Sequence, residues 1–268
     1  MPVDGGSDAG RVTGVTEGAI GWVTFDRPHR HNAISYEMWQ ALPEVLAAHE
    51  ADPEVRAIVL RGAGEKAFIS GADISQFDER RASAAANENY RSVAGTAFTR
   101  LRDASKPTIA MIRGYCIGGG LAVAMCCDLR VAADDTQMGI PAARLGLGYP
   151  QDGVKRLIDV VGPAYTKEIL FTGRNYDAAE AWRMGLVNRV VSVDALADDV
   201  RATAETIGAN APLTIAAAKR AVNETLLPPA EQDMDAVERA IEHCFDSDDF
   251  AEGRKAFAEK RRPVFKGR

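Results

Sequence analysis

The sequence lacks the features of a nucleic-acid-binding, metal-binding, secreted or membrane-spanning protein. Its 268 residues carry 38 Asp and Glu against 32 Lys and Arg, a net charge of −6 that argues against a general surface for DNA or RNA. The four cysteines show no metal-ligand spacing, so we expect reduced, buried thiols and no metal. The most apolar stretch, residues 117–127, is too short to cross a bilayer. No secretory signal is visible at the start of the sequence, and we expect a cytoplasmic protein.

The residues that are present are typical of a folded α/β protein. Hydrophobic residues make up 46% and charged residues 26%, close to the globular average, and the length predicts one domain with an appendage. Short strand-like runs alternate with helical segments in the first part of the chain, which favours an α/β core, and helices dominate from about Tyr165 onward. Expected strands are 12–17 and 20–25 (a hairpin at Gly18), 57–60, 67–70, 107–112 and 129–133; expected helices follow Ser35 and cover 90–101, 121–127, 166–171, 178–184, 196–210, 213–227 and 232–244.

Two glycine-containing segments are candidates for ligand contact. Ile69-Ser70-Gly71-Ala72-Asp73-Ile74 follows a strand with small residues, which suits a backbone N–H that approaches a ligand closely; an ordinary strand-to-loop turn is the alternative. Gly118-Gly119-Gly120 joins a strand to a helix start, where unpaired N–H groups and the helix dipole suit a developing anion; close packing is the alternative. Neither a dinucleotide-binding pattern nor a P-loop fits this turn.

These segments, together with several shorter motifs, resemble the crotonase superfamily, also called the enoyl-CoA hydratase/isomerase family. The resemblance runs from about Val12 to the C-terminus. The further matching motifs, in chain order, are Phe25-Asp26-Arg27-Pro28, Asn32-Ala33, Cys127-Asp128-Leu129-Arg130, Arg156-Leu157, Val161-Gly162, Lys167-Glu168-Ile169-Leu170-Phe171-Thr172-Gly173, Ala178-Ala179-Glu180-Ala181 and Met184-Gly185-Leu186-Val187.

The resemblance implies a fold, an assembly and a reaction type. It implies an α/β spiral of strand-strand-helix units over residues 12–205, after a flexible tail at 1–11, and a C-terminal helical segment, 206–268, that forms homo-oligomers (trimers or hexamers) and completes the CoA site. It further implies an oxyanion hole for a CoA-thioester carbonyl, made by the backbone N–H groups at Ala72 and Gly119. No separate cofactor is expected, since coenzyme A arrives as part of the thioester substrate.

An acidic protein needs local contacts for CoA. The positions that match the family's contacts are Arg27, His29 and Arg30 in the first loop, and Phe257 and Lys260 in the tail, often supplied by a neighbouring subunit. We assign the segment Ala72, Asp73 and Ile74 to CoA contact as well, and expect Asp73 to cap local backbone. A solvated surface charge is the alternative for Arg30 and Lys260, while His49 and His243 read as surface residues.

The sequence departs from the hydratases at both catalytic carboxylates. Alanines, Ala122 and Ala142, occupy the positions of the two glutamates that activate water and deliver a proton, which makes hydration by the usual pair doubtful. The loop with Tyr149 resembles that of methylmalonyl-CoA decarboxylase, a superfamily member that also lacks these glutamates. Asp152 is a candidate base or a turn residue, Tyr149 a substrate contact or a core residue, and Arg144 a ligand for a substrate carboxylate or a surface charge.

Three functions therefore stay open. The first is an enoyl-CoA hydratase/isomerase-family enzyme that forms a thioester enolate, with lyase-type chemistry in fatty-acid or acyl-CoA metabolism. The second is a decarboxylase of a malonyl-type CoA thioester that uses Tyr149. The third is an acyl-CoA-binding oligomer without catalysis. All three predict CoA binding, so turnover is the property that separates them.

Overall fold

The structure, a computed structural model, describes residues 9–73 and 84–268. Most of the predicted tail and the predicted contact Ile74 lie outside these ranges. The predicted hairpin is confirmed: β1 (Arg11–Glu17) and β2 (Ile20–Asp26) pair antiparallel, from Arg11 opposite Asp26 to Glu17 opposite Ile20. The turn between them holds Gly18 at φ 57°, a left-handed conformation that glycine adopts without strain.

The body of the protein is the predicted spiral of strand-strand-helix units. In each unit the first strand joins a six-stranded sheet, the second joins a four-stranded sheet, and a helix returns the chain to the start of the next unit. Adjacent units pair in parallel, as in β3 with β5 and β4 with β6. The three units are β3 (Ala57–Gly62), β4 (Ala67–Ile69) and α3 (Ala84–Arg102); β5 (Thr108–Ile112), β6 (Tyr115–Ile117) and α4 (Gly119–Cys126); β7 (Leu129–Ala133), β8 (Gln137–Gly139) and α5 (Gln151–Thr172).

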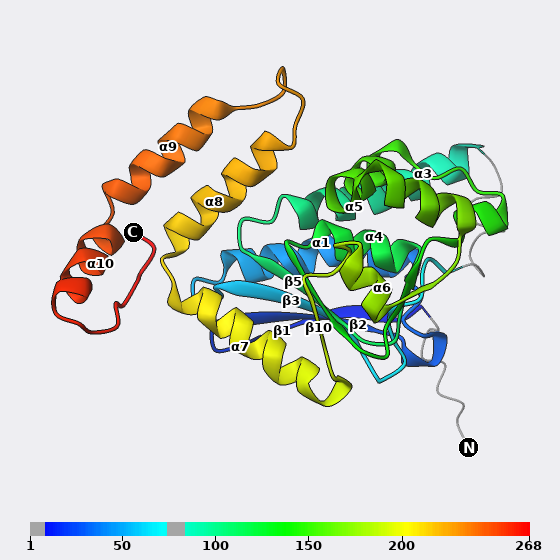
Figure 1. The fold of residues 1–268 in the computed structure, drawn as a ribbon, viewed down its shortest axis with the longest axis horizontal. Coiled ribbons are helices and arrows are strands. Elements are labelled where there is room, and N and C mark those ends of the chain that lie inside the picture. The colour runs from blue at the N-terminus through cyan, green and yellow to red at the C-terminus, as the bar shows by residue number, and fades with distance from the viewer. Residues whose placement is uncertain (1–8, 74–83) are drawn as a thin grey trace.

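The central strands of the larger sheet, β2, β3, β5 and β7, are buried on both faces, which explains why they read as continuous apolar runs, whereas the edge strand β1 is mostly exposed. Along β2, Val23 and Phe25 point into the main core under the helices, whereas Ile20 and Trp22 point into a second core. That second core packs against α7 (Leu196–Ala209). Figure 1 shows α7 on one side of the sheet and α1 (Tyr36–Ala51), α4 and α5 on the other. The sheet edge is completed by β10 (Arg189–Val191), and β9 (Tyr176–Asp177) closes the smaller sheet before α6 (Ala178–Arg183).

Ser35 caps the N-terminus of α1, as predicted, whereas α5 is longer than predicted. Ser35 accepts a hydrogen bond from the Met38 N–H at 3.2 Å and so begins α1, whose stripe of Met38, Leu42 and Leu46 is fully buried. The helix predicted at 166–171 is longer, since α5 begins at Gln151 and bends at Gly162, where φ is 72°. A proline at the next position and a glycine at the bend hide this helix from a pattern reading.

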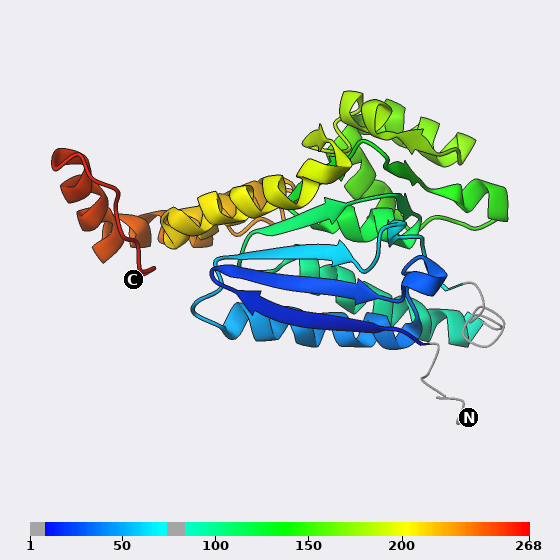
Figure 2. The ribbon, with the colours of Figure 1, turned by 90° about the horizontal axis from the view of Figure 1, so that it is seen from below.

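A helical C-terminal arm extends from the body. It consists of α8 (Pro212–Thr225), α9 (Met234–Phe245) and α10 (Asp248–Ala258). In Figures 1 and 2 these helices, yellow-orange to red, lead away from the sheets. The sequence predicted α8 and α9 and missed α10, which Ser247 begins by accepting a bond from the Phe250 N–H. Across the described ranges, no helix has both the length and the apolarity that a membrane span requires.

The start of α4 lies directly on the end of β4. A Cβ on Gly120 would stand 2.1 Å from the Ile69 carbonyl oxygen and 2.8 Å from the Ile69 Cβ, distances at which the backbone must move. Gly120 is buried, and its missing side chain lets the helix approach the strand this closely.

We expect Gly120→Ala to lower the free energy of unfolding by at least about 1–3 kcal/mol, because the added methyl overpacks a backbone contact. Gly95→Ala is the matched control: nothing lies within 4 Å of the new methyl, and alanine favours a helix interior over glycine by about 1 kcal/mol. Urea unfolding followed by circular dichroism measures both variants. Equal stability of the two would contradict the close approach at Gly120.

Candidate functional site

The two glycine-containing segments singled out in the sequence lie against each other. A Cβ on Gly119 would stand 3.5 Å from the Ala72 backbone nitrogen, and a Cβ on Gly118 would stand 4.0 Å from the Gly71 Cα. Both turns need glycine, since φ is 121° at Gly71 and 54° at Gly118. The fold therefore brings the end of β4 and the start of α4 together at one place.

Two backbone N–H groups at this place have no acceptor among the residues that the structure describes. Ile34 forms a parallel bridge with Ala72: its N–H donates to the Gly71 carbonyl at 2.8 Å, and its carbonyl accepts from the Asp73 N–H at 2.9 Å. The Ala72 N–H therefore points away from Ile34, and Gly119, as the first residue of α4, has no helical acceptor for its own N–H. Within the described part of the chain neither group donates a hydrogen bond. The structure thus brings together the two positions predicted to form an oxyanion hole.

An aromatic wall next to Gly119 was missed by the sequence analysis. The Cζ2 atom of Trp39 lies 3.6 Å from where a Gly119 Cβ would be. The Trp39 indole N–H donates to the Tyr90 hydroxyl at 2.8 Å, and its ring meets Phe98 edge-on at 4.9 Å between centroids. Trp39 belongs to the apolar stripe of α1 and Phe98 to α3, so each residue alone reads as ordinary core. Their convergence on the glycine turn gives the site an apolar side.

Tyr149 is connected to the same region. Its ring lies over Gly153, where a Cβ would meet ring carbon at 2.6 Å, and it packs against the main core. Burial raises the pKa of the phenol to about 12, while the nearby Arg156 guanidinium opposes the shift. That guanidinium lies 5.3 Å from the centroid of Phe98, the ring that contacts Trp39. The phenol therefore stays protonated at neutral pH, and within the described ranges its hydroxyl donates to no acceptor.

Ala122 and Ala142, the alanines predicted to stand where the hydratases have glutamates, differ in burial. Ala122 on α4 is 6% exposed, and Ala142 is half-buried against the main core. Tyr149 packs against the same core as Ala142.

Asp152 and Arg144 are exposed to solvent. Asp152 lies in the first turn of α5, where a carboxylate interacts favourably with the helix dipole. The stem of Arg144 covers Gly173, just beyond the C-terminal end of the same helix. These positions agree with their alternative roles as a helix-start residue and a surface cation, and nothing in the geometry ties either residue to the paired N–H groups.

The predicted CoA contacts of the first loop divide into two groups. His29 and Arg30 are exposed on a short 3₁₀ helix, Pro28–Arg30, beside the end of β4, and the Ser70 hydroxyl donates to the Arg30 carbonyl at 3.4 Å. Arg27, by contrast, is 2% exposed and forms an ion pair of 2.7 Å with Asp73, which is 9% exposed. The structure therefore places both side chains inside the protein, while the CoA contacts predicted for Arg27 and Asp73 and the capping role predicted for Asp73 stay predictions.

Phe257 and Lys260 lie on the C-terminal arm. Phe257 is 88% exposed, and Lys260 follows the end of α10 with φ 55°. Figures 1 and 2 show α10 at the far end of the arm from β4 and α4. A CoA contact by these two residues at the site of the same chain does not fit this arrangement, and a contact with a neighbouring subunit's CoA stays a prediction.

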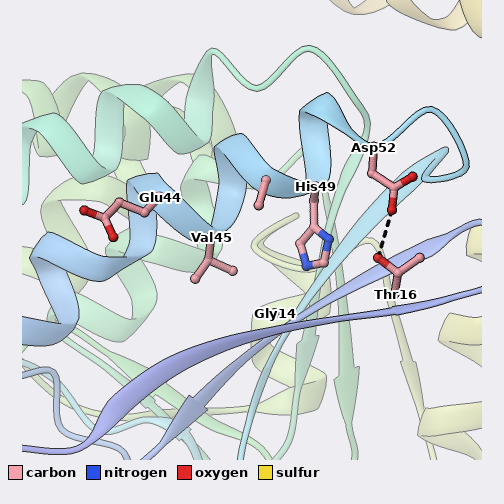
Figure 3. Close-up of a pocket in the computed structure, with 7 residues that line it drawn as sticks. Gly14, Thr16, Glu44, Val45, His49 and Asp52 are labelled. Atoms are coloured by element: carbon pink, nitrogen blue, oxygen red, sulfur yellow. Dashed lines mark hydrogen bonds between the residues drawn. The ribbon is translucent and has the colours of Figure 1, made fainter.

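A separate groove of about 450 Å³ lies between β1 and α1 (Figure 3). His49 was predicted to be a surface residue, and this is wrong: it is 5% exposed and lies 3.2 Å through Nε2 from the Trp22 carbonyl. Gly14 and Gly21 make room for the imidazole, since a Cβ on either would meet the ring within 3 Å. Glu44 and Asp52 line the groove, and their charge disfavours the phosphates of CoA.

The thiols are free and mostly buried. Cys116, Cys126 and Cys127 are buried, Cys244 is half-buried, and burial raises the pKa of the Cys126 thiol to about 11. The predicted unpaired, buried thiols are thus confirmed for three of the four. Over residues 9–73 and 84–268, no group of three or more His, Cys, Asp or Glu could hold a metal ion.

Comparison with known proteins assigns the chain to a family. The spiral with its helical arm is a crotonase fold: a crystal structure of an enoyl-CoA hydratase/carnithine racemase from Magnetospirillum magneticum superposes with a TM-score of 0.90, at 39% identity over 96% of both chains. A model of the family described as enoyl-CoA hydratase/isomerase matches residues 15–268. The chain belongs to the enoyl-CoA hydratase/isomerase family.

Two curated relatives show how the similarity extends along the chain. A carnitinyl-CoA dehydratase from Citrobacter koseri is 39% identical over 255 residues, which cover 94% of this chain and 96% of the relative. A short-chain-enoyl-CoA hydratase from Clostridium acetobutylicum is 35% identical over 246 residues, covering 92% and 94%. The similarity therefore includes both the spiral and the C-terminal arm.

Proposed function

We propose that the protein binds an acyl-CoA thioester and stabilises its enolate between the N–H groups of Ala72 and Gly119. This proposal rests on two backbone N–H groups that donate no hydrogen bond within the described residues and that lie on two glycine turns in contact with each other. Family membership supports the substrate class, since the relatives named above are an enoyl-CoA hydratase and a carnitinyl-CoA dehydratase. An enolate oxygen needs fixed donors in a site that excludes water, and one such donor contributes about 3 kcal/mol.

The chemistry at the acyl carbons differs from hydration by two glutamates. A positioned general acid or base contributes about 10²–10⁴-fold, and alanine at positions 122 and 142 supplies neither. We therefore propose lyase-type chemistry in acyl-CoA metabolism in which the oxyanion hole contributes most of the rate. Trp39 and Phe98 provide the apolar side that strengthens hydrogen bonds to the enolate.

Tyr149 favours a second candidate, decarboxylation of a malonyl-type CoA thioester. When CO₂ leaves, the electron pair of the broken C–C bond becomes the enolate, so no base is needed. A phenol with a pKa of about 12 is protonated throughout the neutral range and can donate a hydrogen bond to a substrate carboxylate. Its hydroxyl has no acceptor in the described part of the chain, which leaves it available for that role.

We further propose that the protein is a homo-oligomer whose C-terminal arm contributes to a neighbouring subunit's CoA site. Large apolar side chains are exposed along the arm, including Val222 (61%), Phe245 (62%) and Phe257 (88%). Exposed apolar surface of this extent marks a protein interface. In such a trimer or hexamer, His29 and Arg30 of one chain and Phe257 and Lys260 of another would hold the CoA moiety.

Removing one donor tests the oxyanion hole. Gly119→Pro deletes the N–H at the first position of α4, where proline is compatible with a helix. We expect turnover of acyl-CoA to fall about 10²–10³-fold. Affinity for CoA alone should stay the same, because free CoA has no thioester carbonyl. Turnover at the wild-type rate would contradict the assignment of Gly119.

Turnover assays separate the candidate reactions. We expect release of CO₂ from methylmalonyl-CoA, reduced at least about 10-fold in Tyr149→Phe by loss of the orienting hydroxyl. Tyr165→Phe, at an exposed tyrosine of α5, the helix that follows Tyr149, is the control. Hydration of crotonyl-CoA is measured by the loss of the enoyl absorbance. Hydration at ordinary enzyme rates would contradict the importance of the missing glutamates. CoA binding without either activity would favour an acyl-CoA-binding oligomer without catalysis.

Sedimentation velocity tests the assembly. We expect the wild-type chain to sediment as a trimer or hexamer, and Val222→Asp with Phe245→Asp to shift it toward monomer by placing charges in the interface. Val15→Asp changes an apolar residue that is 52% exposed on β1 and should leave the assembly unchanged. A monomeric wild-type protein would contradict the proposal.

A further inference from the structure

A buried ion pair stands directly beside one of the two N–H groups. Nη1 of Arg27 lies 2.7 Å from Oδ2 of Asp73, the residue after Ala72, and both side chains are at least nine-tenths buried. Removing two charges from water costs several kcal/mol per ion, so a buried pair is weak evidence for stability. Its location therefore calls for another explanation.

The peptide that carries the Ala72 N–H is held by the loop of residues 27–34. Its carbonyl, that of Gly71, accepts from the Ile34 N–H at 2.8 Å, and this bond sets the direction of the Ala72 N–H on the opposite side of the same planar peptide. The next peptide is held as well, since the Asp73 N–H donates to the Ile34 carbonyl at 2.9 Å. The side chain of Asp73 adds an ionic contact with Arg27 at the start of the same loop.

Arg27 is itself fixed at both of its ends. Its backbone N–H donates to Asn32 Oδ1 at 3.0 Å, and Nη1 donates to the Ala33 carbonyl at 3.2 Å. The Asn32 amide in turn donates to the carbonyls of Ala63 and Ala67, at 2.9 and 2.8 Å. The guanidinium is thus tied to the loop of residues 27–34, and that loop is tied to both ends of the connection between β3 and β4.

We infer that Arg27 and Asp73 are positioning residues, whose ion pair fixes the orientation of the Ala72 N–H toward the thioester oxygen. This inference rests on the proposed function, since it concerns the same pair of donors. The Arg27 guanidinium binds the carboxylate of Asp73, the residue after Ala72. Gly120 fixes the other donor, the Gly119 N–H, because it lets the start of α4 pack directly on Ile69. Loss of the pair loosens the attachment of the loop that carries Ile34, so the peptide that Ile34 holds shifts and one donor moves off the oxygen.

A labelled carbonyl separates this role from a purely structural one. The probe is crotonyl-CoA with ¹³C at the thioester carbonyl, bound to the intact protein, and the readout is the carbonyl stretching frequency in infrared difference spectra. Hydrogen bonds from two donors lower this frequency relative to free crotonyl-CoA. The variants are Asp73→Asn, which keeps the shape and removes the charge, Arg27→Met, and the conservative Arg27→Lys.

We expect Asp73→Asn and Arg27→Met to lose at least half of the frequency shift. For the acyl-CoA that the wild-type protein turns over, we expect both variants to lower kcat about 10–100-fold and to change KM less than about threefold. Arg27→Lys should retain more of the shift than Arg27→Met, because it keeps the charge. The control is Asp128→Asn. Asp128 forms a more exposed ion pair, 2.8 Å from Lys219, with side chains 28% and 10% exposed, and it follows the C-terminal end of α4, whereas Gly119 begins that helix. This substitution should leave the shift unchanged. Urea unfolding compares the stability losses.

Each outcome decides the inference. An unchanged shift in folded Asp73→Asn and Arg27→Met, with a stability loss like that of Asp128→Asn, would overturn it and leave the oxyanion hole intact. If Asp73→Asn does not fold, the comparison of Arg27→Met with Arg27→Lys decides, because equal shifts in these two variants would overturn the inference. A wild-type protein that binds the probe without any shift would overturn the proposed function and the inference with it.

Discussion

The close contact between the first turn of α4 and the end of β4 is the constraint on which the site depends. Gly120 permits it, because any side chain there would collide with the Ile69 carbonyl. The contact sets Gly118 and Gly119 against Gly71 and Ala72, two segments nearly fifty residues apart in the chain. Both segments end strands of the smaller sheet, so the parallel pairing of β4 with β6 brings their ends to the same edge. The paired strands thereby position the two glycine turns relative to each other.

Much of this arrangement could be predicted from the sequence. The β1–β2 hairpin, the buried strands and the capped start of α1 follow from local patterns, and the glycine turns were singled out by their position after strands. The C-terminal helix α10 was missed because its polar, charged sequence carries a narrow apolar stripe, with only Asp249 and Ala256 buried. Local propensity gives such a helix little weight against the basic tail that follows it.

The side chains of the site were harder to predict, since their surroundings depend on tertiary structure. Arg27 was predicted to contact CoA and His49 to lie at the surface, yet the Arg27 side chain is buried beside Asp73 and the His49 ring is buried against Gly14 and Gly21. Trp39, Tyr90 and Phe98 lie on two helices with no shared motif, so only the packing of α1 against α3 reveals their contact. Exposure of a charged group is a property of the fold, and no local pattern encodes it.

Because Arg27 and Asp73 are buried, salt screens them less than it screens the exposed charges of the site. Counterions reach the exposed guanidinium of Arg30 and screen it over a Debye length of about 8 Å at physiological salt. They do not reach a pair whose side chains are 2% and 9% exposed. Salt therefore weakens the attraction of Arg30 for a phosphate while leaving the contact beside Ala72 unscreened, so the capture of an anion and the orientation of a backbone donor respond separately to the medium.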